Sequence, residues 1–144
     1  MFLTRECDYA IRIIRALADG AKKTVKNIAK REKIPEKFAH NITTKLERAN
    51  FVKSTVGRGG GVSLIRPLNN MTIADIITAV DNNRCIGECL SKDAKCDYME
   101  AKKQCAIHHE IARIQAVAMD ALGSKTMDII LFRDGTITPK HQVV

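Results

Sequence analysis

The apolar residues in the first third of the chain recur at spacings of three and four, which predicts a series of amphipathic helices. The first helix is expected to start after Thr4, a favourable N-cap, and to end at Gly20. Two short helices are expected next, one capped by Thr24 and one opened by Pro35. The positions expected to face the core are Cys7, Ala10, Ile11, Ile14, Leu17, Ala18, Val25, Ile28, Ala29, Phe38, Ile42, Leu46 and Ala49.

The pattern changes after the third of these helices. Residues 51–56 and 62–65 contain several β-branched and aromatic side chains, and a glycine-rich segment, GRGGG, joins them, which predicts a hairpin. A short helix, a tight turn, a second short helix and a hairpin follow one another in the order of a winged helix-turn-helix. The expected fold class is therefore mostly α with a small β-hairpin.

Helical spacing returns in the second half of the chain. Thr72, with Asp75 three residues later, predicts a capped helix. The apolar stripe of this helix is expected to consist of Ile73, Ile76, Ile77 and Val80. A long helix is expected from Ala106, and a short final helix is expected after Ser124, which would cap it.

Along the long helix, apolar residues alternate four and three apart, which is the spacing of a coiled-coil seam. These residues are Ile107, Ile111, Ile114, Ala118 and Ala121. A helix with this seam needs a partner, so a homodimer is expected. The pattern divides the chain into a winged-helix domain (1–68), a linker helix with a cysteine loop (69–105), a dimerisation helix with a short final helix (106–132) and a loose tail (133–144).

Charge is distributed unevenly over the 144 residues. The net charge is +8, and residues 1–68 hold 15 Lys and Arg against 6 Asp and Glu, a net of +9. This asymmetry favours a contact between the front half and a polyanion, although a solvated basic surface would look the same. The charged start and the lack of an apolar run of about 18 residues predict no signal peptide and no membrane helix. A cytoplasmic location with reduced thiols is therefore expected.

Two segments have the chemistry of a DNA contact. On the third helix, Lys37, His40, Asn41 and Thr44 share the face opposite the core, with Lys45 beside them. Such side chains hydrogen-bond to base edges and phosphates, although an ordinary solvated helix face has a similar composition. In the hairpin, Gly59 and Gly60 would let the turn approach a sugar-phosphate wall, so that Arg58 enters a minor groove. A flexible surface turn is the alternative for this segment.

Four of the five cysteines lie within one loop. Three residues separate Cys85 from Cys89, six separate Cys89 from Cys96, eight separate Cys96 from Cys105, and two separate Cys105 from His108. Thiolates with an imidazole suit zinc or an iron–sulfur cluster, but the short CxxC pairs of structural zinc are absent from this sequence. Free thiols that exchange disulfides are the alternative. The fifth cysteine, Cys7, lies on an apolar helix face and is expected in the core.

Taken together, these elements resemble the winged-helix transcription regulators related to IscR and NsrR. The resemblance covers about residues 1–132 and rests on the opening MFLTRECDYA, the helix-turn-helix IPEKFAHNITTKLERANFV, the wing RGGG, the helix MTIADIITAVD and the loop ending CAIHHEI. It implies a homodimer that binds palindromic operators and a loop whose three cysteines hold an iron–sulfur cluster.

The cluster ligands that the resemblance implies are Cys89, Cys96 and Cys105. The IscR-like pattern adds His108, whereas the NsrR-like pattern takes an Asp from the first helix of the other subunit, which is Asp8 here. In the family, five residues separate successive ligand cysteines, and this chain has six and eight. Cys85 is an extra thiol that could replace Cys89 as a ligand.

The sequence therefore predicts a dimeric, repressor-type transcription regulator that binds a near-palindromic double-stranded operator. It would sense iron–sulfur status, oxygen, redox state or nitric oxide through a labile cluster of the 2Fe–2S or 4Fe–4S type. One alternative is a cluster-free regulator that switches by thiol oxidation, and another is a zinc-stapled adaptor that binds nucleic acid or protein. The sequence contains no constellation typical of an enzyme, and neither a membrane nor a catalytic site is expected.

Overall fold

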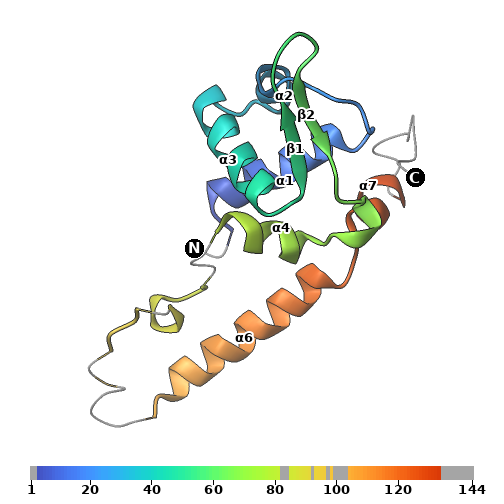
Figure 1. The fold of residues 1–144 in the computed structure, drawn as a ribbon. Coiled ribbons are helices and arrows are strands. Elements are labelled where there is room, and N and C mark those ends of the chain that lie inside the picture. The colour runs from blue at the N-terminus through green and yellow to red at the C-terminus, as the bar shows by residue number, and fades with distance from the viewer. Residues whose placement is uncertain (1–2, 82–84, 92, 97, 99–103, 134–144) are drawn as a thin grey trace.

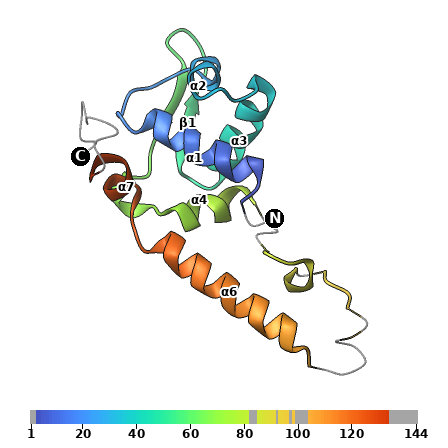
Figure 2. The same ribbon diagram turned by 180° about the vertical axis from the view of Figure 1, so that it is seen from behind.

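The computed structural model describes residues 3–81, 85–91, 93–96, 98 and 104–133. A head, made of the first four helices, a hairpin and the last helix, holds the buried core, and one long helix projects from it as an arm (Figure 1). The view from behind shows the same division, with α4 between the rest of the head and the arm (Figure 2). Within the described residues, helices that could cross a bilayer are absent.

The three helices at the start of the head begin where the sequence signals place them. Helix α1 (Arg5–Leu17) is capped by Thr4, whose hydroxyl accepts from the backbone N–H of Cys7. Helix α2 (Val25–Glu32) is capped by Thr24 in the same way, and α3 (Glu36–Arg48) starts after Pro35. Each hydroxyl cap satisfies a backbone donor of the first turn, which has no partner within the helix. The helix-turn-helix expected from the sequence is thus present.

The core-facing side of α3 differs from the expected one. Phe38 was expected to be buried, but 47% of it is exposed and its ring lies edge-on to Tyr9 of α1, with the centroids 6.1 Å apart. Ala39 and Thr43 lie in the core instead, together with Ile42 and Leu46 of the expected stripe. The prediction for Phe38 was wrong because Phe38 and Ala39 lie four and three residues before the buried Ile42, and both spacings fit a helix. The buried Thr43 hydroxyl is satisfied, since it donates to the carbonyl of Ala39 at 2.7 Å.

The hairpin forms the wing of the fold. Strands β1 (Val52–Thr55) and β2 (Gly61–Leu64) pair antiparallel, with Val52 opposite Leu64. Both strands lie within one residue of the expected bounds. In the turn between them, the N–H of Gly60 donates to the carbonyl of Gly57 at 2.9 Å. A Cβ on Gly60 would lie 2.4 Å from the carbonyl oxygen of Thr55, so this turn requires glycine there.

The side of the head nearest the arm is built from two segments far apart in sequence. A 3₁₀ turn, η1 (Leu68–Asn70), leads into α4 (Ile73–Val80), where Thr72 and Asp75 form the expected capping box. The last helix, α7 (Met127–Arg133), returns to the head, and the N–H of Met127 donates to the carbonyl of Met71 at 2.9 Å. Both methionines are fully buried. Helix α7 therefore completes the core of the head.

The arm consists of α6 (Ala106–Gly123), which begins at the expected residue and has no buried residue. The short turn η2 (Glu88–Leu90), from the cysteine loop, lies beside it. Ser124 was expected to cap the final helix, but it is the C-cap of α6, where its N–H donates to Ala121. That prediction was wrong because a serine between two helices can cap the end of the first helix or the start of the second. Residues 134–144 of the expected tail lie outside the described residues, and the expected division into segments stays a prediction.

Candidate DNA-binding face and cysteine loop

Helix α3 presents the polar residues expected to meet DNA. Lys37, His40, Asn41 and Thr44 are all exposed on the side away from the core. The Thr44 hydroxyl donates to the carbonyl of His40 at 3.1 Å, and the His40 imidazole lies 3.9 Å from the carboxylate of Glu36. Lys37 and Asn41 have no polar partner among the described residues, so both side chains are available to a ligand.

Arg48, which the sequence analysis did not select, continues this face. It is exposed, and it follows Thr44 by four residues and Asn41 by seven, the spacings that place helical residues on one side. Its guanidinium has no hydrogen bond or ion pair within the described part of the chain. The spacing of seven from Asn41 was a signal in the sequence that could have identified Arg48 as part of the face.

Lys45 lies at the edge of this face and is already occupied. Its ammonium is 2.6 Å from the carboxylate of Glu6 on α1 and donates to the carbonyl of Val80 on α4 at 3.1 Å. About a third of each charged side chain is exposed. The expected role of Lys45 as a DNA contact stays a prediction, and the structure gives it two intramolecular partners.

The wing presents its cation at the tip of a defined turn. Arg58 is exposed, and the glycines on either side have positive φ, +103° at Gly57 and +82° at Gly59. Apart from its chain neighbours, no atom of the described residues would lie within 4 Å of a Cβ at Gly59, so one side of the turn is open. Val56, just before the turn, is fully exposed. The tip therefore offers one cation and one apolar side chain to a partner.

The described part of the cysteine loop lies along α6. The N–H of Ile86 donates to the side-chain carbonyl of Gln115 at 3.0 Å. A Cβ on Gly87 would lie 3.5 Å from Ile111, which shows how closely the loop approaches the helix. The thiol of Cys85 donates to the carbonyl of Leu90 at 3.1 Å, so this extra thiol closes a local turn.

The expected metal ligands are only partly brought together. Cys105 is the N-cap of α6, and its sulfur accepts from the N–H of His108 at 3.5 Å. Nδ1 of His108 is buried and lacks a hydrogen-bond partner. All five cysteines are free thiols, and the described residues contain no group of three metal-ligating side chains. Cys89 and Cys96 are half-buried, and parts of the loop around Cys96 lie outside the described residues.

Cys7 and Asp8 are neighbours in α1 but lie in different surroundings. Cys7 is fully buried, which confirms its expected place in the core. Asp8, the alternate ligand from a second subunit, has half of its side chain exposed and pairs with Arg12 at 2.9 Å. Within the chain, this carboxylate therefore supports the first turn of α1.

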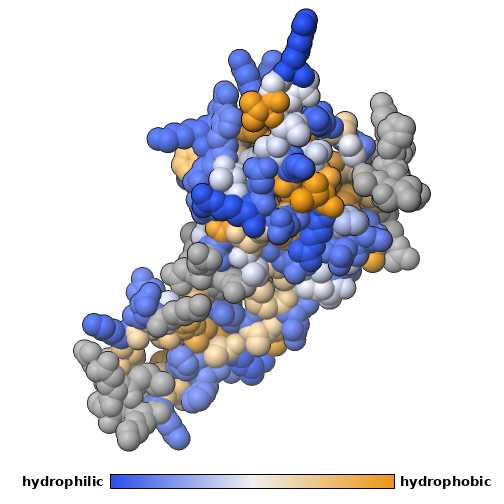
Figure 3. All heavy atoms as spheres, viewed as in Figure 1, coloured by the Kyte–Doolittle hydropathy of each residue, from blue (hydrophilic) through white to orange (hydrophobic). Residues whose placement is uncertain are grey.

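The expected dimer seam of α6 divides into two faces. Ile111 is half-buried against the cysteine loop, whereas Ile107 and Ile114 are 71% and 45% exposed. Val117, which the sequence analysis did not include, is 58% exposed. Four exposed apolar residues of α6 share one side of the helix by their spacing, and we call them the outer face: Ile107, Ile114, Val117 and Ala121. Apolar colouring extends along the arm in Figure 3.

A polar pair shares the outer side of α6. Arg113 donates two hydrogen bonds to the carboxylate of Glu110, at 2.7 and 3.0 Å. These bonds lower the pKa of Glu110 below its usual value and raise the pKa of Arg113. The pair is therefore charged at neutral pH, and Glu110 lies within the apolar strip, since it follows Ile107 by three residues and precedes Ile114 by four.

Comparisons with known proteins give one consistent result. The model of the Rrf2 family, described as an iron-dependent transcriptional regulator, matches residues 3–132. An Rrf2-like transcriptional regulator of the helix-turn-helix type from Rhodobacter capsulatus is 28% identical over 137 residues, which cover 90% of this chain and 91% of that protein.

Two solved structures share the fold. CymR, the global cysteine regulator of B. subtilis, has a TM-score of 0.67 at 22% identity, over 90% of this chain and 95% of that one. IscR of T. potens has a TM-score of 0.69 at 20% identity, over 93% of this chain and 88% of that one. At these identities, the likeness supports the arrangement of head, wing and arm and leaves the chemistry of the loop open.

Proposed function

The chain belongs to the Rrf2 family of transcriptional regulators, and we propose that it is a homodimeric repressor whose cysteine loop controls its affinity for a near-palindromic operator. Its relatives are named as transcriptional regulators, so the chain is a DNA-binding regulator and not an enzyme. The alternative of a zinc-stapled adaptor has no support among these relatives.

The observation that carries the DNA-binding mode is the continuous exposed face of α3. Lys37, Asn41 and Arg48 lie on it without intramolecular partners among the described residues. Asn pairs well with adenine, whereas Lys and Arg bind guanine or phosphate. Arg58 on the wing would add a minor-groove contact beside the major groove that α3 enters.

The outer face of α6 supports the homodimer. Three aliphatic side chains are exposed there over about three helical turns, on a helix that has no buried residue. Pairing this face with its copy would remove apolar surface from water and would bring two heads to one side of a duplex. The two copies of α3, as the recognition helices, would then meet half-sites about one helical turn apart, roughly 34 Å, or farther if the wings spread them.

The donor set of the loop fits a soft metal group. Thiolates and imidazole are the ligands that iron–sulfur clusters and zinc take, and the buried Nδ1 of His108 lacks a partner beside Cys105. We assign Cys89, Cys96, Cys105 and His108 as the ligands, because the thiol of Cys85 is used within its own turn. An iron–sulfur cluster supplies, when bound, a group whose redox state and integrity respond to oxidants.

The loop lies between two parts that such a change would affect. It begins directly after α4 and ends at the N-cap of α6, and Gln115 holds one of its backbone groups. A change in the ligands would therefore alter both the end of α4 and the first turns of the arm. Helix α4 belongs to the head, which would bind DNA, and the arm carries the proposed dimer contact.

A cluster-free thiol switch is the second candidate. The described residues contain no group of three metal-ligating side chains. One of the proteins with a similar fold, CymR, is named as a global cysteine regulator. Four half-buried thiols in one loop are accessible to oxidants. In this case Asp8 and His108 would have no role as ligands.

Anaerobic purification decides between these candidates. Iron, sulfide and zinc are measured together with the visible spectrum, and operators are then selected from random duplex DNA at fixed salt. Iron and sulfide with visible absorption support the cluster, whereas their absence together with oxidant-dependent DNA binding supports the thiol switch. If no duplex sequence is selected in any redox state, the proposed repressor function is wrong.

A further inference from the structure

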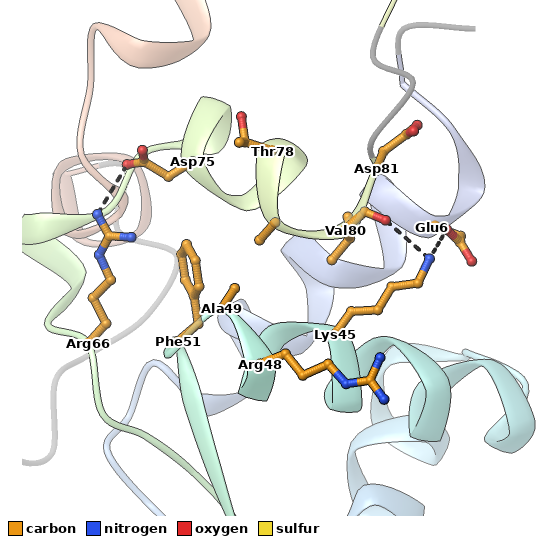
Figure 4. Close-up of a pocket in the computed structure, with 11 residues that line it drawn as sticks. Glu6, Lys45, Arg48, Ala49, Phe51, Arg66, Asp75, Thr78, Val80 and Asp81 are labelled. Carbon is orange, nitrogen blue, oxygen red and sulfur yellow. Dashed lines mark hydrogen bonds and ion pairs between the residues drawn. The ribbon is translucent and has the colours of Figure 1, made fainter. Parts of the chain in front are cut away.

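The recognition helix, α4 and α1 meet at a groove with a volume of about 810 Å³ (Figure 4). Its lining includes three cationic and three acidic side chains above an apolar floor. The charged residues are Lys45, Arg48, Arg66, Glu6, Asp75 and Asp81. Lys45 extends across this groove from α3 toward the end of α4, as the dashed lines in Figure 4 show.

The two partners of Lys45 belong to different elements. Glu6 lies in the first turn of α1, and Val80 is the last residue of α4. The ammonium reaches the Glu6 carboxylate at 2.6 Å and the Val80 carbonyl at 3.1 Å. A carbonyl at the C-terminus of a helix carries partial negative charge, which favours a cation there. To reach a DNA phosphate, Lys45 would have to break both bonds.

The junction that Lys45 holds is the entrance to the cysteine loop. Asp81 follows Val80 directly, and its carboxylate accepts from the hydroxyl of Thr4, the N-cap of α1, at 3.3 Å. The N–H of Asp81 donates to the carbonyl of Ile77, so α4 ends at this point. The start of the loop is thus linked to α1 through Thr4 and to α3 through Lys45.

We propose that Lys45 is a positioning residue, which couples the orientation of the recognition helix to the start of the cysteine loop and does not contact DNA. The inference rests on the proposed function, since it assumes that the loop state changes operator affinity. A displacement of Val80 would move or release the Lys45 ammonium and thereby shift α3 against α1. Arg48, one turn later and unpaired within the described residues, is the phosphate contact instead.

The salt dependence of operator binding separates the two roles. A lost phosphate contact lowers the slope of log K against log salt by about one unit per subunit. We expect Arg48→Met to show this loss and Lys45→Met to leave the slope unchanged while weakening binding several-fold. Lys45→Arg should keep both contacts and restore affinity. A slope loss for Lys45→Met equal to that of Arg48→Met would overturn the proposal.

The coupling is measured as the ratio of operator affinities before and after alkylation of the loop thiols, with Cys7 protected by burial. For Lys45→Met this affinity ratio should be smaller than the square root of the ratio for the unsubstituted protein, which means that more than half of the coupling free energy is lost. Glu6→Gln should reduce it similarly, and the double variant should be no worse than Lys45→Met alone. Additive effects, or an unchanged ratio, would contradict the coupling role.

A different result would identify failure of the proposed function itself. If alkylation leaves the affinity of the unsubstituted protein unchanged, the loop signal is wrong, and so is the coupling role of Lys45. The salt slope then still decides whether Lys45 positions α3 or contacts DNA. Circular dichroism of each variant confirms that the head is folded.

Discussion

The head of this molecule buries its apolar side chains, whereas the arm leaves many of its own exposed. In α1, six of 13 residues are buried, whereas α6 has 18 residues and none is buried. The head closes its own core with α7, which returns to it from beyond the arm. The arm exposes an apolar outer face, which the described part of the chain leaves uncovered. Stability is therefore concentrated in the head, and the proposed homodimer would depend on the arm.

The cysteine loop belongs to the arm more than to the head. Its described contacts with Gln115 and Ile111 are on α6, while its start is tied to the head at Asp81. Under the proposed function, a chemical change in this loop would alter the dimer contact and the head orientation without disturbing the core.

The largest effect is expected from charges placed on the outer face. Ile114→Asp with Val117→Asp would bury two unpaired carboxylates in the proposed interface, each at a cost of several kcal/mol. Sedimentation should show a monomer, and operator affinity should fall by about 100-fold or more. His109→Asp, on an exposed position of α6 away from this face, is the matched control and should remain dimeric. A dimer that survives the double substitution would place the interface elsewhere.

The next effect concerns the core of the head. Ile77 on α4 is fully buried, so Ile77→Ala should lower the free energy of unfolding by about 2–5 kcal/mol. The same truncation at Ile107 should change it by less than about 0.5 kcal/mol in the monomeric Ile114→Asp/Val117→Asp background. Urea unfolding measures both values. Equal losses would show that the arm is part of the cooperative core.

A smaller effect is expected for single cations. Arg48→Ala should weaken operator binding by about tenfold and lower the salt slope by about one unit per subunit. Arg113→Ala removes an exposed cation from the arm and should leave both quantities unchanged. Fluorescence anisotropy over a range of salt concentrations provides the measurement. A response to Arg113→Ala alone would place the DNA contact on the arm.

The smallest effect on stability is expected in the loop. Cys105→Ser keeps a hydroxyl at the N-cap of α6, where serine is favourable, so the free energy of unfolding should change by less than about 0.5 kcal/mol. Because one thiolate is lost, bound iron and sulfide, measured anaerobically, should disappear. Cys85→Ser, whose thiol is used in a local turn, is the control that should retain them. Unfolding of Cys105→Ser would indicate a structural metal site.

The sequence was most informative where the signal is local. The caps at Thr4, Thr24 and Thr72 were all predicted, because a capping hydroxyl bonds to a backbone N–H only three residues away. The glycine-rich turn was also recognised, since positive φ is a property of single residues. Phe38 was wrongly assigned to the core, because spacing alone does not distinguish neighbouring positions on the edge of a helix face.

The sequence by itself determined which residues share a helix face and which ligand types occupy the loop. Only the tertiary structure decided what covers each face: Ile111 packs against its own loop, whereas Ile114 stays exposed. It also gave Lys45 its partners, because Val80 lies 35 residues away along the chain. Periodicity reports the direction of a side chain about its own helix axis. The identity of its neighbour depends on how distant elements pack, which no local pattern encodes.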